Sequence, residues 1–276
     1  MRNLTEQNLT DAVLDRLSGC QDARVKEVLG SLIRHLHGFI RDVEPTPEEW
    51  FEGIKFLTQT GQISDDKRQE YILFSDTLGV SMLVDAINNR KSAGATESSV
   101  LGPFYVEGAP DKNTGADLAP GEGPGVVVSG VVKGIDGTTI QGAVLDVWQT
   151  APNGLYHVQD KDQPEHHLCG KVHADAHGNY SFRTLKPVSY PIPTDGPVGK
   201  MLKQMGRHPF RPAHIHFIVS APGYKPVITQ LFSEGDAYIE TDSVFGVKNS
   251  LVVDYRASGD EWMVDYDFVL EPVSNA

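Results

Sequence analysis

The strongest constraint on the fold is a change of residue pattern near Ala93. Before this point, apolar residues recur every three or four positions, which is typical of amphipathic helices. After it, glycine and proline are frequent, and short β-branched or aromatic runs alternate with turns, which is typical of an antiparallel sandwich or barrel. Helices followed by strands predict an α+β chain, with a helical N-terminal domain at 1–98 and an antiparallel β-sandwich domain at 99–276.

The N-terminal domain is predicted to be helical almost throughout. Its longest apolar stripe covers 25–40 and ends before Glu44-Pro45. The sequence Thr46-Pro-Glu-Glu is a capping box with proline at the first helical position, and it predicts a helix that carries Trp50 and Ile54 on its inward side. We interpret the apolar positions as core. A dimer face is the alternative, because several of the stripes are wide.

The β-sandwich domain is predicted from a series of strand-forming runs. They cover 126–134, 143–149, 171–174, 180–184, 214–219, 227–232, 250–255 and 262–270. The segment at 108–125 is rich in glycine and proline and is predicted to be a loop.

The strand predicted at 214–219 begins His-Ile-His. Side chains alternate between the two faces of a strand, so His214 and His216 face the same side. Two imidazoles on one face of a rigid strand form half of a metal site. The chain has another pair with this spacing, His35 and His37, but it lies in a helical pattern, where residues two apart do not share a face. We interpret that second pair as solvated helix surface.

The remaining ligands of such a metal site are not carboxylates close to the histidines in sequence, because no Asp or Glu lies between Gly196 and Ala221. Loop tyrosines are the alternative, namely Tyr156 after a turn and Tyr190 in the sequence Tyr-Pro-Ile-Pro. Coordination by a highly charged cation deprotonates acidic ligands, and phenolates with imidazoles suit ferric iron better than zinc or copper(I). Considered alone, each tyrosine is more simply explained as half-buried packing.

Composition argues against several function classes. The formal charge is −13, with 37 acidic and 24 basic residues and no basic cluster, so we expect no nucleic-acid partner. Two cysteines are too few for a disulfide framework and favour a reducing compartment. No apolar run is long enough to span a bilayer, and the first 17 residues lack the apolar stretch of a signal peptide. We therefore expect a cytoplasmic protein that does not bind membranes.

Five motifs resemble those of the intradiol ring-cleaving dioxygenases. In chain order they are Leu101-Gly-Pro-Phe-Tyr-Val, Leu145-Asp-Val-Trp-Gln, Asn153-Gly-Leu-Tyr, Tyr190-Pro-Ile-Pro and Arg211-Pro-Ala-His-Ile-His. The resemblance extends through nearly the whole chain, and five motifs in the right order are much more specific than any one of them. Within that family the chain most resembles the members that cleave hydroxyquinol, followed by those that cleave catechol or chlorocatechol.

The resemblance implies that the β-sandwich domain is catalytic and binds one non-haem Fe(III) per subunit. The implied ligands are Tyr156, Tyr190, His214 and His216. Tyr190 and His216 would be axial, and Tyr190 would also accept a substrate proton. Arg211 would stabilise negative charge on the ring, and Gln230 would lie near the iron. The implied reaction inserts both atoms of O2 between the two hydroxyl-bearing carbons, so that catechol yields cis,cis-muconate and hydroxyquinol yields 3-hydroxymuconate, which tautomerises to maleylacetate.

The resemblance also implies a mostly apolar substrate pocket. Its residues are Leu73, Asp76, Val100, Leu101, Gly102, Pro103, Phe104, Ile192, Pro193 and Val244. An unpaired buried carboxylate at Asp76 is costly, but it can accept a hydrogen bond from a third ring hydroxyl and so disfavour a ring that lacks one. This favours hydroxyquinol over catechol. The alternative is that Asp76 is an exposed helix residue. Val244 is small and leaves room for a substituted ring.

The implied partners are a small aromatic diol or triol, O2 and a second copy of the chain bound through the N-terminal helices. Family members also carry a lipid between their subunits. Two other classes remain open. The run 130–144, followed by Gly178-Asn-Tyr-Ser-Phe, also resembles transthyretin-like sandwich modules that bind without chemistry. A zinc or Fe(II) enzyme of cupin type would need a carboxylate ligand, and we find no candidate for it near the two histidines.

Overall fold

The computed structural model describes residues 2–65 and 68–273. They form two compact units that divide between Thr58 and Gln59, and this boundary falls within one helix. The first unit is helical, and the second contains every strand that the structure describes. Helices followed by sheets confirm the predicted fold class. The functional boundary between residues 98 and 99 stays a prediction.

The N-terminal helices are α1 (Leu9–Asp15), α2 (Ala23–Val43) and α3 (Pro47–Ile63). The end of α2 and the start of α3 lie where the sequence signals predict them. Helix α2 begins after Asp22, whose carboxylate accepts the Val25 N–H, and it ends before Glu44, which has a left-handed φ of 47°. The capping box before α3 is confirmed, because the Thr46 N–H donates to Glu49 at 2.8 Å and the Glu49 N–H donates to the Thr46 hydroxyl at 3.2 Å.

The prediction that the apolar faces of these helices lie inward is wrong for the single chain. Trp50 is 56% exposed and Ile54 is 40% exposed. The stripe on α2 is exposed as well, and it comprises Val25, Val28, Leu29, Leu32, Leu36, Phe39, Ile40 and Val43. Periodicity identifies an apolar face, but it does not say whether the same chain covers that face.

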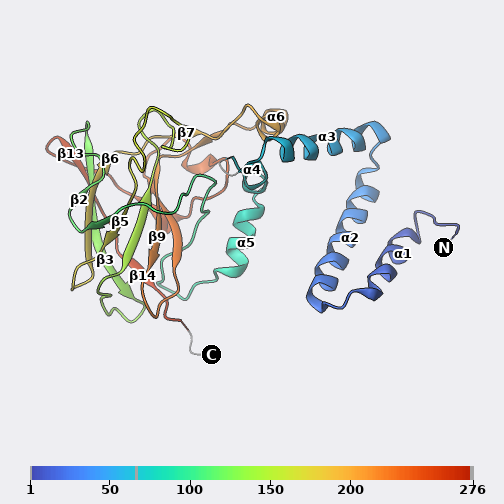
Figure 1. The fold of residues 1–276 in the computed structure, drawn as a ribbon, viewed down its shortest axis with the longest axis horizontal. Helices are drawn as coiled ribbons and strands as arrows, with labels where there is room; N and C mark the ends of the chain where they lie inside the picture. The colour runs from blue at the N-terminus through green and yellow to red at the C-terminus, as the bar shows by residue number, and fades with distance from the viewer. Residues whose placement is uncertain (1, 66–67, 274–276) are drawn as a thin grey trace. The chain divides into compact units, whose positions relative to one another are not determined.

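Three more helices belong to the second unit: α4 (Glu70–Thr77), α5 (Val80–Asn88) and α6 (Pro197–Gln204). Helices α4 and α6 lie next to one another (Figure 1). The sequence interpretation assigned no element to α6. No helix in the described part of the chain is long and apolar enough to cross a bilayer.

The strands form two larger sheets and a short ladder (Figure 1). The first sheet has the order β1 (Asp111–Asn113), β5 (Gly170–His173), β4 (Val144–Trp148), β9 (His214–Ser220), β10 (Val227–Ser233) and β11 (Val252–Val253). The second has the order β12 (Arg256–Ser258), β13 (Glu261–Asp265), β3 (Gly125–Gly134), β6 (Asn179–Leu185) and β2 (Ala116–Asp117), with β14 (Phe268–Leu270) also paired to β3. The ladder joins β7 (Tyr190–Pro191) to β8 (Phe210–Arg211).

The sheets differ from the prediction in detail. The long central pairs are antiparallel, but several shorter pairs, such as β1 with β5 and β13 with β3, are parallel. The segment 108–125, predicted to be loop, contributes β1 and β2. The single strand predicted at 262–270 is two strands, which are separated at Tyr266. The Tyr266 carbonyl oxygen would lie 1.9 Å from a Cβ on Gly130, so a glycine is needed opposite it.

The core lies between the two larger sheets and fixes the orientation of β9. Ile215, Phe217 and Val219 are buried in this core with residues of β3, β4 and β6. His214 and His216 therefore face the opposite side of the sheet, as the alternation predicts. In register with His216 lie Trp148 on β4 and Gln230 on β10, so the neighbouring strands present side chains on the same face.

Candidate metal centre

Four side-chain donor atoms converge on this face of the first sheet. The Tyr156 Oη lies 2.9 Å from the Tyr190 Oη and 2.9 Å from the His216 Nε2. The His214 Nε2 lies 3.1 Å from the His216 Nε2 and 3.5 Å from the Tyr190 Oη. All four residues are between 1% and 4% exposed. The structure thus brings together Tyr156 from a loop, Tyr190 from the short strand β7 and two histidines from β9, which the sequence separates by up to 60 residues.

The spacing of these atoms fits a metal coordination shell. With metal–nitrogen or metal–oxygen distances of about 2.0–2.2 Å, neighbouring ligand atoms lie roughly 3 Å apart. The His214 Nδ1 lies 2.6 Å from the Pro212 carbonyl oxygen, which can only accept, so Nδ1 carries the proton and Nε2 directs a lone pair at the other donors. His214 is therefore set up as an Nε2 ligand.

Burial sets the protonation states of the four residues. Burial lowers the pKa of His214 and of His216 well below the usual value, and the nearby positive charge of Arg211 lowers both further, so both imidazoles are neutral. Burial also raises the pKa of Tyr156 and Tyr190 above the usual value for a phenol. The phenols therefore ionise at neutral pH only if a bound cation stabilises the phenolates.

Arg211 places a positive charge beside the four donors. Its Nη1 lies 3.0 Å from the His214 Nε2, and its Nη2 donates to the Gln230 Oε1 at 2.8 Å. Gln230 in turn donates to the Val100 carbonyl at 2.6 Å. Burial opposes the charge on Arg211, but the neighbouring Asp242 and the two tyrosines outweigh it and raise its pKa. The guanidinium is permanently charged.

Two residues that the sequence reasoning missed contact the centre or its arginine, and a third, Asp236, contacts the backbone next to His214. The Trp148 ring stacks on His216, with centroids 4.7 Å apart and planes 13° apart. The Asp242 carboxylate accepts from the Arg211 Nε and Nη2, both at 3.1 Å. The Asp236 carboxylate accepts the Ala213 N–H next to His214. Trp148 could have been predicted from the strand register, which places it opposite His216. Asp242 could not, because it is 31 residues from Arg211 and no local sequence pattern points to it.

The predicted substrate pocket forms a cavity against these residues. Nine of the ten predicted side chains line it together with Tyr156, Tyr190, Arg211 and His216. Pro193 instead lines a neighbouring pocket of about 230 Å³, which shares Leu73, Pro103 and Phe104 with the cavity. Gly102 has a φ of 78°, and a Cβ there would lie 3.4 Å from the His216 ring, so a glycine suits this wall.

Asp76 is a buried wall residue and not an exposed helix residue. It is 3% exposed, and burial raises the pKa of its carboxyl group. Asp76 lies on helix α4, which the buried Glu70 holds in place. The Glu70 carboxylate accepts a hydrogen bond from the Val198 N–H at 3.2 Å and one from the Arg68 guanidinium at 3.0 Å. Arg68 also donates to Asp195 at 2.8 Å. These contacts tie α4 to the segment that follows Tyr190.

Tyrosine is the residue type that completes this site. Among the residues that the structure describes, no group of three or more His, Cys, Asp or Glu side chains could hold a metal ion. A cupin-type site needs a carboxylate ligand in addition to its histidines. The donor set of two phenols and two neutral imidazoles instead fits ferric iron.

Comparison with known proteins identifies the family. Residues 100–272 match the family model described as dioxygenase, and residues 22–96 match the model described as catechol dioxygenase N terminus. A hydroxyquinol 1,2-dioxygenase from Rhizobium sp. is 48% identical, with 96% of this chain and 95% of the relative covered. A catechol 1,2-dioxygenase from Candida albicans is 39% identical, with 98% and 93% covered. The solved structure of a hydroxyquinol 1,2-dioxygenase from Pseudomonas putida DLL-E4 is similar with a TM-score of 0.91 and 48% identity, with 97% and 99% covered.

These matches decide against a non-catalytic transthyretin-like module, because both parts of the chain match dioxygenase models. The chain therefore belongs to the intradiol ring-cleaving dioxygenases, as its five motifs predict, and is an oxidoreductase.

Proposed function

We propose that this enzyme cleaves hydroxyquinol (benzene-1,2,4-triol) between its two adjacent hydroxyl-bearing carbons and gives 3-hydroxy-cis,cis-muconate, which tautomerises to maleylacetate. The observation that carries the choice of substrate is the buried carboxylate of Asp76 in the cavity wall. The higher identity to a hydroxyquinol-cleaving relative than to a catechol-cleaving one supports it.

The proposed cofactor is one Fe(III) per subunit, held by Tyr156, Tyr190, His214 and His216. The chemistry of the donor set and the spacing of the donor atoms support this choice. When bound, ferric iron supplies a Lewis acid and an electron acceptor for a substrate diol.

The residues around it have separate tasks. The Tyr190 Oη accepts a proton from a substrate hydroxyl, so that general-base catalysis needs no separate carboxylate. The Arg211 guanidinium, fixed by Gln230 and Asp242, stabilises the negative charge that develops on the ring. The apolar wall formed by residues such as Leu73 and Ile192 excludes water and holds a flat ring.

Asp76 acts as the selector for the third hydroxyl. In the cavity wall the Asp76 carboxyl group has lost most of its contact with water. A ring hydroxyl that hydrogen-bonds to it replaces a hydrogen bond that water would otherwise make. The Ser81 hydroxyl already hydrogen-bonds to this carboxyl group, so a ring without the third hydroxyl leaves it with that partner alone, which disfavours catechol. The alternative, a catechol or chlorocatechol 1,2-dioxygenase that yields a muconate or chloromuconate, is supported by the small side chain of Val244 in the same wall.

The test is oxygen uptake with hydroxyquinol, catechol and chlorocatechol side by side, on protein assayed for iron. We expect the highest kcat/KM with hydroxyquinol and one O2 consumed per ring. Faster turnover of catechol would replace the proposed substrate with the alternative, and no uptake by iron-loaded protein with any of the three would end the proposal.

We also propose a homodimer formed through the N-terminal helices, with a lipid as a further candidate ligand between the subunits, and a cytoplasmic location. The exposed apolar stripe of α2 supports the dimer, and the two free cysteines, Cys20 and Cys169, support a reducing compartment. Light scattering should give twice the chain mass of 30.2 kDa.

A charge on the α2 stripe should disrupt this dimer. Leu36 is 52% exposed in the middle of the stripe, so Leu36→Asp would bury an unpaired carboxylate at the interface, whereas Lys26→Asp places the same charge on an exposed position outside the stripe. We expect Leu36→Asp to lower the mass measured by light scattering towards 30.2 kDa and Lys26→Asp to leave it unchanged. A wild-type protein that is monomeric at micromolar concentration would refute the dimer.

A further inference from the structure

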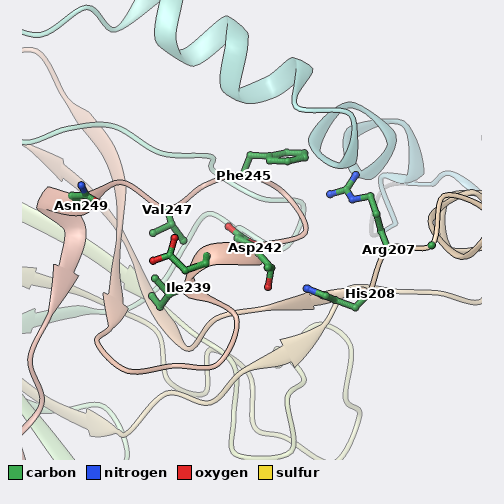
Figure 2. Close-up of a pocket in the computed structure, with 10 residues that line it drawn as sticks. Arg207, His208, Ile239, Asp242, Phe245, Val247 and Asn249 are labelled. Atoms are coloured by element: carbon green, nitrogen blue, oxygen red, sulfur yellow. The ribbon is translucent and has the colours of Figure 1, made fainter.

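Asp242 is a buried carboxylate that serves two parts of the active site at once. It is 5% exposed, and the described residues around it include one cation, Arg211, and several backbone N–H groups. Figure 2 shows Asp242 on the wall of a surface pocket of about 540 Å³, together with Phe245 and Val247 from the segment that follows it. The arginine that lines this pocket, Arg207, is already engaged, because it donates to the carbonyl oxygens of Thr77 and Ser243.

The first partner of Asp242 is the guanidinium of Arg211. Oδ1 accepts from Nε and Oδ2 accepts from Nη2, each at 3.1 Å, so the planar carboxylate meets the planar guanidinium in a two-point contact. Nη1 is left to point at the His214 Nε2, 3.0 Å away, and Nη2 also donates to Gln230. The two-point contact fixes both the position and the tilt of the guanidinium, which Gln230 alone cannot do.

The second partner is the loop from Asp242 to Gly246. The same oxygens accept the Val244 N–H at 3.3 Å and the Gly246 N–H at 2.9 Å. Phe245 has a left-handed φ of 61°, which is unfavourable for a bulky residue and persists only where its surroundings hold it. This loop carries Val244, which lines the substrate cavity.

Gly246 shows how closely the two partners approach. A Cβ at this position would lie 2.9 Å from the Arg211 Nη2 and 3.2 Å from the Asp242 Oδ2. The loop backbone, the carboxylate and the guanidinium therefore pack as one unit, and moving the carboxylate would move both other parts.

We propose that Asp242 is a positioning residue for the reaction, because its carboxylate fixes the Arg211 guanidinium beside the metal centre and fixes the loop that presents Val244 to the ring. This inference rests on the proposed function. Asp242 itself lines the surface pocket and not the substrate cavity, so it acts through Arg211 and the loop.

The test measures kcat for four iron-loaded proteins: the wild-type enzyme, Asp242→Asn, Arg211→Gln and the variant that carries both substitutions. Asparagine keeps the size of the side chain but loses the charge and one acceptor oxygen. We expect kcat for hydroxyquinol to fall about 100-fold with little change in KM, since misplacing a catalytic group by about 1 Å costs that much. In the Arg211→Gln background the same change should lower kcat less than about threefold, since neighbouring residues that act together are not additive.

A readout independent of activity is the hydrogen exchange of the Val244 and Gly246 amides, which should accelerate in Asp242→Asn. Asp175→Asn is the matched control, because the Asp175 carboxylate also accepts two backbone N–H groups at 2.8 Å but lies in an exposed hairpin. It should leave kcat and the exchange of both amides unchanged.

Wild-type kcat in folded, iron-loaded Asp242→Asn would overturn the inference. The inference would also be overturned if the fold-losses in kcat of Arg211→Gln and Asp242→Asn multiplied in the double variant, because the two residues would then act independently. If Asp242→Asn does not fold, Asp242→Glu keeps the charge and displaces the carboxylate by one methylene, and wild-type kcat in that variant would overturn the inference too. An inactive wild-type enzyme with full iron would instead refute the proposed function, so the two failures are distinguishable.

Discussion

Replacing Tyr190 by phenylalanine removes only the phenolic oxygen, and we expect kcat for hydroxyquinol to fall about 1,000-fold in the folded protein. The loss of a positioned proton acceptor alone costs about 10²- to 10⁴-fold. The ring would keep its edge-to-face contact with Tyr156, with centroids 5.6 Å apart, so the packing of the site would remain. Oxygen uptake gives kcat, and thermal unfolding followed by circular dichroism verifies the fold.

Tyr180→Phe is the matched control for this variant. Tyr180 is 1% exposed in the core between the sheets, and its hydroxyl donates to the Tyr266 carbonyl at 2.7 Å. Losing that hydrogen bond should destabilise the fold by about 1 kcal/mol and leave kcat unchanged. Wild-type turnover by Tyr190→Phe would contradict the role of Tyr190 as ligand and proton acceptor.

Replacing Asp76 by alanine should shift the ratio of kcat/KM for hydroxyquinol over catechol about 100-fold towards catechol. A site that hydrogen-bonds a substrate hydroxyl discriminates against the ring without it by up to about 10⁴-fold, because its own polar group is then left unpaired. Alanine removes that polar group and so removes the penalty on catechol. Oxygen uptake with both substrates measures the ratio, and thermal unfolding should show an equal or higher Tm, because an expensive buried carboxyl group is gone.

Asp85→Ala controls for the loss of an acidic residue from a neighbouring helix. Asp85 lies on α5 and accepts from Lys248 at 3.1 Å, outside the lining of the substrate cavity. We expect it to leave the substrate ratio unchanged. An unchanged ratio in Asp76→Ala as well would mean that Asp76 does not select the substrate.

Local rules predicted those parts of the molecule that depend on nearby residues. Alternation along a strand placed His214 and His216 on one face, and the core on the other face confirms it. The capping box fixed the start of α3, because its two hydrogen bonds join residues only three apart. Tyr156 lies in a loop and Tyr190 in the two-residue strand β7, where no periodicity selects a side chain. The residues alone offered both as candidates, and the resemblance identified them as ligands.

Features that depend on distant contacts could not be predicted in this way. Periodicity predicts a core face on α2, but the stripe is exposed, since periodicity identifies an apolar face and not what covers it. Asp242 lies 31 residues from Arg211 in sequence and contacts it only through the fold, so no pattern near the histidines indicates it. The break between β13 and β14 lies at Tyr266, whose carbonyl packs against Gly130 on a different strand, and periodicity along 262–270 does not show that contact.

The most direct test of the proposed centre is the iron content and visible absorption spectrum of the freshly purified enzyme. We expect one iron per chain and a red-brown solution with phenolate-to-Fe(III) charge-transfer absorption, which changes in both Tyr156→Phe and Tyr190→Phe. An active enzyme that is colourless, or that contains zinc in place of iron, would contradict a ferric site built from two phenolates and two imidazoles.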